Sequence, residues 1–396
     1  MGYTKDFFKI KKGWSLQKDK IFNDYLTPYI DKILTTHRPL VIIDCFAGKG
    51  RFDDGNVGSP VIIAEHIKSV LEGNSENKNI HGIFIENKYI EELETNLRSY
   101  KNCEIWQGTF EENINRIRKL DSRSNLFLYV DPYGIKCLDF QQFELIKAEN
   151  FHSLEMLLNF NSFGFLREGC RLLKLDYENL FKEDQSEDEY ELDEANTIDR
   201  MNNIAHEEYW QSIIEDYKND KIDMFKAEEL FINKYMNQLK NLFTYVINIP
   251  IRLKIRNIPK YRLIFGSNHP GGMILMADKM SRIWKELKNV QRGSQKVLFE
   301  YEFPDPSIQL GFDLKEGILG ILKEYKRPIP LEELLIKLIE KYGIAFSEKE
   351  YKDKLKEMER NQIIIDREPA LTERGKKATA LDYRNRKYKI TVRLKC

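Results

Sequence analysis

The sequence predicts an α/β protein with a largely parallel sheet, and two observations point to it. Between residues 39 and 265, short apolar runs alternate with amphipathic stretches of helical spacing, as expected of strands joined by crossover helices. Acidic residues and glycines also stand directly after several of the apolar runs, where open α/β sheets bind their ligands. The expected architecture is therefore a Rossmann-like sheet with a binding site at the carboxyl ends of its strands.

Five strands and four helices account for the first part of this pattern. The expected strands are residues 39–46, 81–88, 103–108, 125–134 and 153–161, and the expected helices are residues 61–73, 88–100, 110–120 and 140–148. Two further β-rich segments, 243–252 and 261–268, predict a sixth strand and an antiparallel seventh, followed by a covering helix over 271–287. The complete sheet thus has seven strands.

Three further regions flank or interrupt this sheet-forming domain, which spans residues 39–290. Residues 1–38 are expected to form an N-terminal helical segment, and a charged helical insertion runs from about 167 to 242. From 312 to 396, three helical patterns precede two β-like segments, which describes a C-terminal winged-helix-like domain. A small helical lid on the preceding domain explains the same pattern equally well, because no base-reading side chain can be named.

Charge is balanced over the whole chain but not along it. The 396 residues contain 63 Lys and Arg and 63 Asp and Glu, which gives no overall attraction to nucleic acid or to a membrane. Residues 362–396 hold ten basic and four acidic side chains, whereas residues 183–194 are almost entirely acidic and are expected to be a solvated loop. The candidate contacts for nucleic-acid phosphates are Arg384, Arg386, Lys387, Lys389, Arg393 and Lys395.

The cysteine pattern and the lack of a long apolar run favour a reduced, cytoplasmic protein. The five cysteines are scattered, and no C-x-x-C pair suggests a zinc or redox site, so no metal is expected. No apolar run approaches the roughly 18 residues of a membrane span, and the first residues lack the apolar core of a signal peptide. We therefore expect no membrane association.

A glycine-containing loop follows the first expected strand, with the sequence DCFAGKG. Glycines let the backbone pass close to a ligand and supply positive φ angles. A full dinucleotide signature would be G-x-G-x-x-G with a helix starting at once, whereas this loop runs on through residues 51–60. A nucleotide-like cofactor without a pyrophosphate therefore fits better than NAD. Its candidate contacts are Asp44, Phe46, Ala47, Gly48 and Gly50.

The second and third expected strands end in residues suited to a nucleoside. Glu86, followed by Asn87, stands where a carboxylate can accept hydrogen bonds from ribose hydroxyls. After the third strand, Gln107, Gly108 and Thr109 offer side-chain and backbone groups to an adenine edge. A surface Glu at a strand end is the alternative interpretation of Glu86.

The fourth expected strand ends in Asp131, Pro132, Tyr133 and Gly134, of which Asp131, Pro132 and Tyr133 are the candidate catalytic residues. The carboxylate can bond an amino group, the proline fixes the backbone, and the aromatic ring can stack on a planar base. An ordinary β-turn is the alternative, because D-P-Y-G is also good turn chemistry. After the fifth strand, residues 159–163 provide polar and aromatic groups for either an active-site wall or a plain loop.

Taken together, these motifs resemble those of class I S-adenosylmethionine-dependent methyltransferases and, more closely, of the three-Cys-motif partner protein family. The motifs that carry the likeness are Trp14-Ser15-x-x-Lys18, DCFAGKG, Gly58-Ser59-Pro60, DPYG and YRLIFGSNHPGG, in consistent order over residues 10–290. The resemblance implies a Rossmann-like methyltransferase sheet and S-adenosylmethionine as cofactor. It also implies a phage or defence-related setting and a separate partner protein that bears the three-cysteine motif.

The resemblance also assigns roles to individual residues. It places Asp44, Phe46, Gly48 and Gly50 at the methionine part of the cofactor, Glu86 at the ribose, and residues 131–133 on the acceptor side. It leaves open whether Trp14, Ser15 and Lys18 form a clamp over the cofactor or simply pack there.

One departure from the methyltransferase pattern bears on the reaction. Enzymes that methylate amino groups usually have two prolines between the acidic residue and the ring, whereas DPYG has one, which advances Tyr133 by one position. We expect methyl transfer to a nucleic-acid nitrogen, with Asp131 orienting the acceptor and Tyr133 stacking on it. The alternative is a non-catalytic binding or scaffold protein whose Rossmann-like domain serves the partner.

Overall fold

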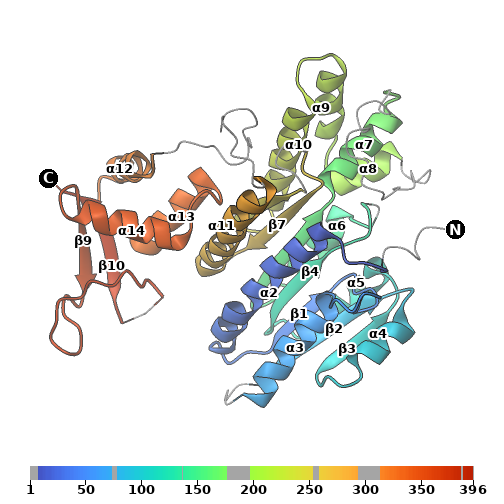
Figure 1. Ribbon diagram of the computed structural model, residues 1–396, viewed down its shortest axis with the longest axis horizontal. Coiled ribbons are helices and arrows are strands. Elements are labelled where there is room, and N and C mark those ends of the chain that lie inside the picture. The colour runs from blue at the N-terminus through green and yellow to red at the C-terminus, as the bar shows by residue number, and fades with distance from the viewer. Residues whose placement is uncertain are drawn as a thin grey trace. The chain divides into compact units, whose positions relative to one another are not determined.

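The chain divides into two compact units, Met1–Asn268 and His269–Cys396. The computed structural model describes residues 8–73, 78–135, 137–175, 197–252, 258–292, 313–384 and 387–395 (Figure 1). The acidic run at 183–194 lies outside these residues.

A seven-stranded sheet is the centre of the first unit. Its strands are β1 (Leu40–Asp44), β2 (Ile80–Glu86), β3 (Cys103–Gln107), β4 (Asn125–Val130), β5 (Ser153–Phe160), β6 (Tyr245–Ile251) and β7 (Tyr261–Ser267). Their order across the sheet is β3-β2-β1-β4-β5-β7-β6. Strand β7 pairs antiparallel with both of its neighbours, and the remaining pairs are parallel. The predicted α/β fold with a mostly parallel seven-stranded sheet is thus confirmed.

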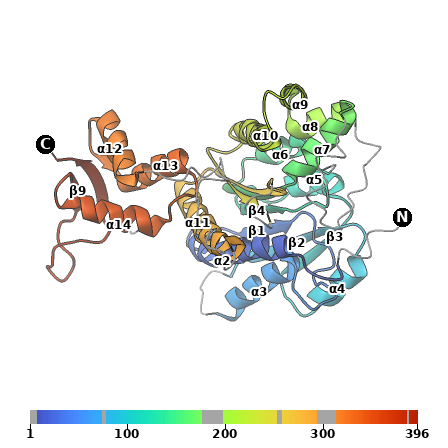
Figure 2. The same cartoon turned by 45° about the horizontal axis from the view of Figure 1, so that its top comes forward.

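Helices cover both faces of this sheet. They are α2 (Gly13–Leu34), α3 (Ser59–Glu72), α4 (Ile90–Leu97), α5 (Phe110–Arg118), α6 (Phe140–Lys147), α7 (Ser162–Leu172), α8 (Ile198–Ala205), α9 (Tyr209–Lys218) and α10 (Met224–Leu239). Figure 2 shows α2, α3 and α4 on one face, and α5 to α10 on the other. Helices α8, α9 and α10 lie in the region expected to be a helical insertion.

The burial of the strands explains why the apolar runs predicted them correctly. Every residue of β1 (LVIID) and of β4 (NLFLYV) is buried, as expected of central parallel strands covered on both faces. At the edge of the sheet, β3 (CEIWQ) buries only Trp106 fully. The centre of the sheet is therefore formed by the most apolar runs, and the carboxyl ends of β1 and β4 lie side by side.

Helix α2 packs on the sheet through a stripe of aromatic residues. Phe22 stacks on Tyr129 of β4 with ring centroids 4.2 Å apart, and Tyr25 meets Phe265 of β7 edge to face. Lys18 lies one turn before Phe22 on the same helical face, because residues four apart are neighbours on a helix. The packing of these aromatic residues thus places Lys18 at the carboxyl end of β4.

A buried ion pair holds α7 and α10 to the sheet. Arg262 at the start of β7 donates to Glu228 of α10 at 2.8 Å, and Ser162 at the start of α7 donates to the same carboxylate at 2.7 Å. The side chains of Arg262 and Glu228 are almost completely buried. Removal of either partner would leave an uncompensated buried charge, so this contact fixes which end of the sheet the insertion covers.

The second unit combines a long helix with a smaller α/β arrangement. Its elements are α11 (Pro270–Arg292), α12 (Leu314–Tyr325), β8 (Ile329–Pro330), α13 (Leu331–Tyr342), α14 (Glu348–Glu359), β9 (Ile363–Glu368) and β10 (Lys389–Leu394). Strand β10 pairs antiparallel with β8 and β9, so the order is β8-β10-β9. The three expected helices and two expected strands are present, and β8 is an additional short strand.

A buried carboxyl group in β5 gives a test of this packing. Glu155 accepts hydrogen bonds from the Tyr25 hydroxyl at 2.6 Å and the Ser267 hydroxyl at 2.9 Å, while burial raises its pKa to about 7. A raised folded-state pKa means that ionisation is disfavoured in the folded protein. Ionisation of Glu155 therefore lowers the free energy of unfolding. This loss is absent below pH 4.5, the unfolded pKa, and reaches its full size above about pH 7.

We therefore expect Glu155→Gln to remove a pH-dependent loss of stability of up to roughly 3 kcal/mol. The neutral amide keeps groups that can bond Tyr25 and Ser267, so the variant should match the wild type near pH 4.5 and exceed it near pH 8. The measurement is urea unfolding of both proteins across this range. A difference in unfolding free energy that does not change with pH would contradict the prediction.

Candidate functional site

The candidate site lies where the strand order reverses, between β1 and β4. Asp44, the last residue of β1, is opposite Tyr129 of β4 in the parallel register. The chain proceeds from β1 to β2 and β3 on one side and returns to β4 on the other, and open α/β sheets bind their ligands beyond the strand ends at such a reversal. The sequence-predicted residues after β1, β2, β3 and β4 therefore all stand at one edge of the sheet.

Asp44 is the most deeply buried acidic group at this edge. The backbone N–H of Phe46 donates to its Oδ1 at 3.2 Å, whereas its Oδ2 has no hydrogen-bond partner within the described part of the chain. Burial raises the pKa of Asp44 to about 7. Hydrogen bonding from the Ser59 side chain and the Phe46 N–H opposes this shift, and the like charges of Asp131 and Asp19 add to it. An unpartnered buried carboxylate oxygen is unusual in a folded protein and is suited to a cationic group.

The glycine loop uses the conformational freedom that its sequence predicts. Gly48 and Gly50 have φ angles of 63° and 81°, in the left-handed region that favours glycine. The Gly58 N–H donates to the Gly50 carbonyl at 2.8 Å and closes the loop just before α3 begins. A Cβ on Gly48 would approach Phe8 to 2.9 Å, so the N-terminal segment passes directly over the loop.

Glu86 connects the glycine loop to the end of β2. Its Oε2 accepts from the Gly48 N–H at 2.7 Å, and its Oε1 accepts from the N–H groups of Lys88 and Tyr89 at 2.7 and 3.1 Å. A carboxylate has about four lone-pair sites, so capacity for a further donor remains. Glu86 thus shapes the loop and can still accept a hydroxyl, whereas Asn87 is exposed beside it.

The residues after β3 act mainly on the local backbone. Gly108 has a φ of 113° and donates to the Glu86 carbonyl at 3.0 Å, which ties the ends of β2 and β3 together. Thr109 is the N-cap of α5 in a capping box: Glu112 N–H donates to its hydroxyl, and the Thr109 N–H donates to the Glu112 carboxylate at 2.7 Å. The Thr109 hydroxyl therefore caps a helix, and Ala47 is buried in the adjacent loop.

Asp131 is held by three donors from three elements. Lys18 of α2 lies 2.8 Å from both carboxylate oxygens, Asn159 of β5 donates to Oδ1 at 2.7 Å, and the Tyr129 hydroxyl donates to Oδ2 at 3.3 Å. The Lys18 ammonium is nearly buried, and the Asp131 side chain is about one quarter exposed. The carboxylate is therefore fixed in position but still reaches the surface.

Aromatic rings surround the Lys18 ammonium on its other side. Lys18 lies 5.2 Å from the Tyr261 ring centre, and the Trp14 ring lies 6.5 Å from that of Tyr261. Lys260 stands over Trp14 at 4.0 Å. These cation–π contacts are strengthened by burial, so Trp14 and Lys18 pack as one unit against the start of β7.

The two other residues of the candidate catalytic segment differ in exposure. Pro132 is buried, while Tyr133 has 55% of its surface exposed. Large aromatic side chains are rarely this exposed in a folded domain, although its ring also has contacts within the protein. Phe46 is half-buried and packs beside Phe110 with ring centroids 5.8 Å apart, as part of the core near the loop.

The N-terminal contacts are the part of the site that the sequence did not reveal. Lys11 bonds the Val57 carbonyl and pairs with Asp19, and its backbone N–H donates to Asp54 at 2.9 Å. These contacts join residues up to 46 positions apart, for which the sequence holds no local signal. The sequence indicated these contacts only through the helical spacing of Trp14 and Lys18. That spacing predicted that the two side chains share one face of a helix, but not which residues they contact.

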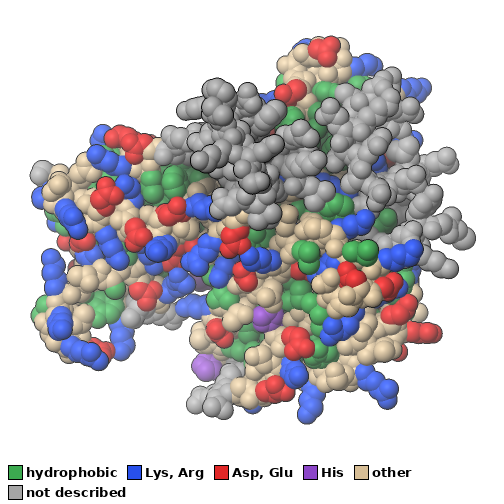
Figure 3. All heavy atoms as spheres, viewed as in Figure 1, with side chains coloured by type: hydrophobic (Ala, Val, Ile, Leu, Met, Phe, Trp, Pro, Cys, Tyr) green, Lys and Arg blue, Asp and Glu red, His purple; other side chains and the backbone are tan. Residues whose placement is uncertain are grey.

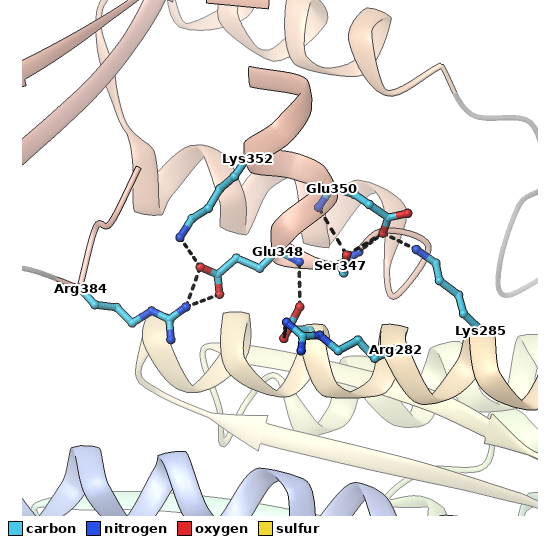
Figure 4. A network of polar contacts seen from close by, with 8 residues as sticks. Arg282, Lys285, Ser347, Glu348, Glu350, Lys352 and Arg384 are labelled. Carbon is cyan, nitrogen blue, oxygen red and sulfur yellow. Dashed lines mark hydrogen bonds and ion pairs between the residues drawn. The ribbon is translucent and has the colours of Figure 1, made fainter. Parts of the chain in front are cut away.

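The predicted nucleic-acid contacts in the second unit are largely paired with carboxylates. Figure 4 shows Arg384 bonded to both oxygens of Glu348, which also pairs with Lys352. Two further ion pairs join Lys387 to Glu373 and Arg393 to Asp366. Lys389 stands opposite Glu368 in the strand register. Arg386 lies outside the described residues, and Lys395 donates its N–H to the Gln362 carbonyl.

No family model matches the chain, and no curated protein matches it significantly. None of the described helices is both long and apolar enough to cross a bilayer. Within the described ranges, no group of three or more His, Cys, Asp or Glu side chains is arranged to hold a metal ion. An open cavity of about 380 Å³ lies at the opposite edge of the sheet, lined by residues such as His81, Asn102 and Asp121, away from the candidate site.

The Lys18–Asp131 pair can be tested by a double-mutant cycle with Lys18→Met and Asp131→Asn. Each single change leaves its partner's charge largely buried and should cost about 1–3 kcal/mol of unfolding free energy. The double variant should lose less than the sum, with a coupling energy of about 1–3 kcal/mol. Urea unfolding of the four proteins measures this.

A matched control is the pair Lys49 and Asp53, which is 3.6 Å apart and more exposed. Its cycle, Lys49→Met with Asp53→Asn, should give a coupling energy below about 0.5 kcal/mol. Equal coupling in the two pairs would show that burial does not strengthen the contact at Asp131.

Proposed function

We propose that the first unit is an S-adenosylmethionine-dependent methyltransferase that acts on nucleic acid. The observation that carries the proposal is the unpartnered Oδ2 of Asp44, buried beside Gly48 and Gly50 at the strand-order reversal. The sheet supports it, because six strands share one direction and β7 alone is antiparallel, as in the seven-stranded methyltransferase sheet. Membership of the three-Cys-motif partner protein family is proposed on the motifs alone.

The residues present fit the charge of this cofactor. Asp44 offers a carboxylate oxygen to the methionine ammonium, and a cation there would remove the penalty for keeping Asp44 ionised. Gly48 and Gly50 supply the positive φ angles that turn the loop at the end of β1. Glu86 would accept from the ribose, while the Gly108 backbone and the exposed Asn87 stand beside the adenine position. The sulfonium supplies an already activated methyl group.

The remaining residues would position the acceptor. Tyr133 presents an exposed ring on which a planar base can stack, and Pro132 fixes the backbone between the ring and Asp131. An acceptor amino group would donate to Asp131 in place of Tyr129, whose hydroxyl makes the longest of the four contacts. Lys18 and Asn159 would keep the carboxylate still during this exchange, so catalysis would rest on positioning.

The second unit supports a role in nucleic-acid contact. The succession α12, β8, α13, α14, β9 and β10, with a three-stranded antiparallel sheet, supports a winged-helix-like domain. A separate protein with the three-cysteine motif, a cytoplasmic location and a phage or defence-related setting follow from the resemblance and belong to the same proposal.

A second candidate function is a non-catalytic scaffold that serves this partner. One observation favours it: DPYG has a single proline, which places Tyr133 one position closer to Asp131 than in enzymes that methylate amino groups. In that case the Lys18–Asp131 pair would be purely structural, and cofactor binding, if present, would stabilise a binding surface.

Calorimetric titration with S-adenosylmethionine tests the cofactor site through Asp44. Because binding of a cation favours the ionised form of a group whose pKa is about 7, affinity should rise by up to about 25-fold between pH 5.5 and 7.5. The variant Asp44→Asn should bind about 10- to 100-fold more weakly and lose this pH dependence. S-adenosylhomocysteine keeps the ammonium and should respond in the same way.

The matched control is Asp121→Asn, at the opposite edge of the sheet beside Arg123. It should bind both compounds as the wild type does. Binding that is equally strong in Asp44→Asn would place the cofactor elsewhere, and no binding by the wild type would remove the methyltransferase proposal.

Transfer of a labelled methyl group to DNA and RNA tests the acceptor side. Asp131→Ala should lower the rate by at least about 100-fold with little change in cofactor affinity, and Tyr133→Ala should mainly weaken nucleic-acid binding. Full activity of Asp131→Ala would exclude its proposed role. Cofactor binding by the wild type without any transfer would favour the scaffold.

A further inference from the structure

The long connection between β9 and β10 contains a second, tight hairpin at residues 371–377. The Thr372 N–H donates to the Lys376 carbonyl at 2.7 Å, and the Gly375 N–H donates to the Thr372 carbonyl at 2.8 Å. The Thr372 hydroxyl accepts from the Lys376 N–H, and Gly375 has a φ of 70°, which only glycine adopts freely. The tip is therefore closed by its own backbone hydrogen bonds.

Three cations stand at this tip within four residues. Arg374, Lys376 and Lys377 are all exposed, and the structure records no ion pair for them within the residues it describes. The one acidic residue of the hairpin, Glu373, pairs with Lys387 from the other side of the loop. Figure 3 shows Lys and Arg side chains over the loop that follows β9 in Figure 1. The tip thus keeps a local excess of positive charge.

This hairpin differs from the rest of the second unit, whose other cations are paired with carboxylates or stand among them, as Lys323, Lys326 and Arg327 do beside Glu324 at the end of α12. Arg384 and Arg393 are engaged with carboxylates, as described above. The exposed side of α14 carries both signs, with Lys349 and Lys356 beside Asp353 and Glu357. A helix of mixed charge offers no continuous basic face to a polyanion, so attraction is concentrated at the hairpin.

We propose that the 371–377 hairpin binds the phosphate backbone of a nucleic acid through Arg374, Lys376 and Lys377. This rests on the proposed function for the identity of the polyanion. Three cations on one closed turn lie near enough together to contact neighbouring phosphates of a single nucleic-acid backbone. Because the tip is already ordered, little conformational freedom is lost on contact.

The surroundings of the hairpin favour a phosphate backbone over a lipid surface. Leu371 is the one large apolar side chain recorded as exposed in the described part of this loop, whereas interfacial binding needs an extended apolar face. Arg and Lys are the main donors to phosphate oxygens in protein–nucleic acid contacts, and residues 371–377 contain no Asn or Gln that could read adenine. The expected binding is therefore independent of sequence and strongly dependent on salt.

The test uses the full chain with Arg374, Lys376 and Lys377 all changed to Gln. Fluorescence anisotropy measures its affinity for a short DNA duplex of arbitrary sequence, and for the matching RNA duplex, over a range of KCl concentrations. Loss of three phosphate contacts should make the slope of log K against log salt shallower by about 2–3, with affinity lower on the order of 100-fold at 0.1 M salt.

The matched control changes Lys323, Lys326 and Arg327 to Gln, which removes the same charge from exposed positions at the end of α12. It should leave the slope unchanged. An unchanged slope in the hairpin variant, an equal loss in the control, or loss of binding to phosphatidylserine vesicles alone would each overturn the proposal. Calorimetry with S-adenosylmethionine on the same variant separates the two proposals: a failed hairpin with intact cofactor binding overturns this inference only.

Discussion

The charge balance at the carboxyl edge of the sheet is the constraint on which the candidate site depends. Three carboxylates, Asp19, Asp44 and Asp131, influence one another there, and two lysines are available to them. Lys11 pairs with Asp19 and Lys18 with Asp131, so Asp44 is left without a cation. Because Asp44 is also the most deeply buried of the three, the carboxylate without a lysine partner lies at the buried end of β1. Both lysines come from the N-terminal segment, which explains why that segment folds over the glycine loop instead of extending away from it.

The sheet could be predicted from the sequence because its strands are apolar runs with clear ends. β1 and β4 are buried along their whole length, so hydrophobicity alone marks them, and the residues after them are polar because they lie at the open edge. β8 could not be found in this way, because two residues show no alternation and its pairing with β10 depends on a segment about 60 positions later. The prediction therefore succeeds where burial is continuous and fails where pairing is purely long-range.

The candidate site shows the same division. Asp44, Gly48, Gly50 and Glu86 could be identified because each follows a strand. The partner of Asp131 could not, since Lys18 is 113 residues away and only the packing of α2 brings it there. Thr109 is a different case: Thr109-x-x-Glu112 is a capping-box pattern that the sequence shows openly, and the structure gives its hydroxyl to the helix. A polar residue that follows a strand at the candidate site can therefore use its side chain to cap a helix.

The excess of basic residues in the sequence predicted nucleic-acid contacts in the tail of the second unit. Ion pairing in the folded protein, however, decides which of these cations can attract a binding partner. Arg384 is bound to Glu348, 36 residues earlier, which offsets part of its charge, whereas no ion pair is recorded for the three cations at the 371–377 tip within the described residues. Asp44 is the corresponding case for negative charge, because no lysine in the described part of the chain is paired with its carboxylate.

In a chain with equal numbers of basic and acidic residues, most charges are cancelled by folding, so recognition depends on the few positions where cancellation is incomplete. An unmatched buried carboxylate suits a small cation, because burial excludes larger groups and strengthens the attraction. Unmatched cations on an exposed tip suit an extended polyanion, because many phosphates can reach them without desolvating a core.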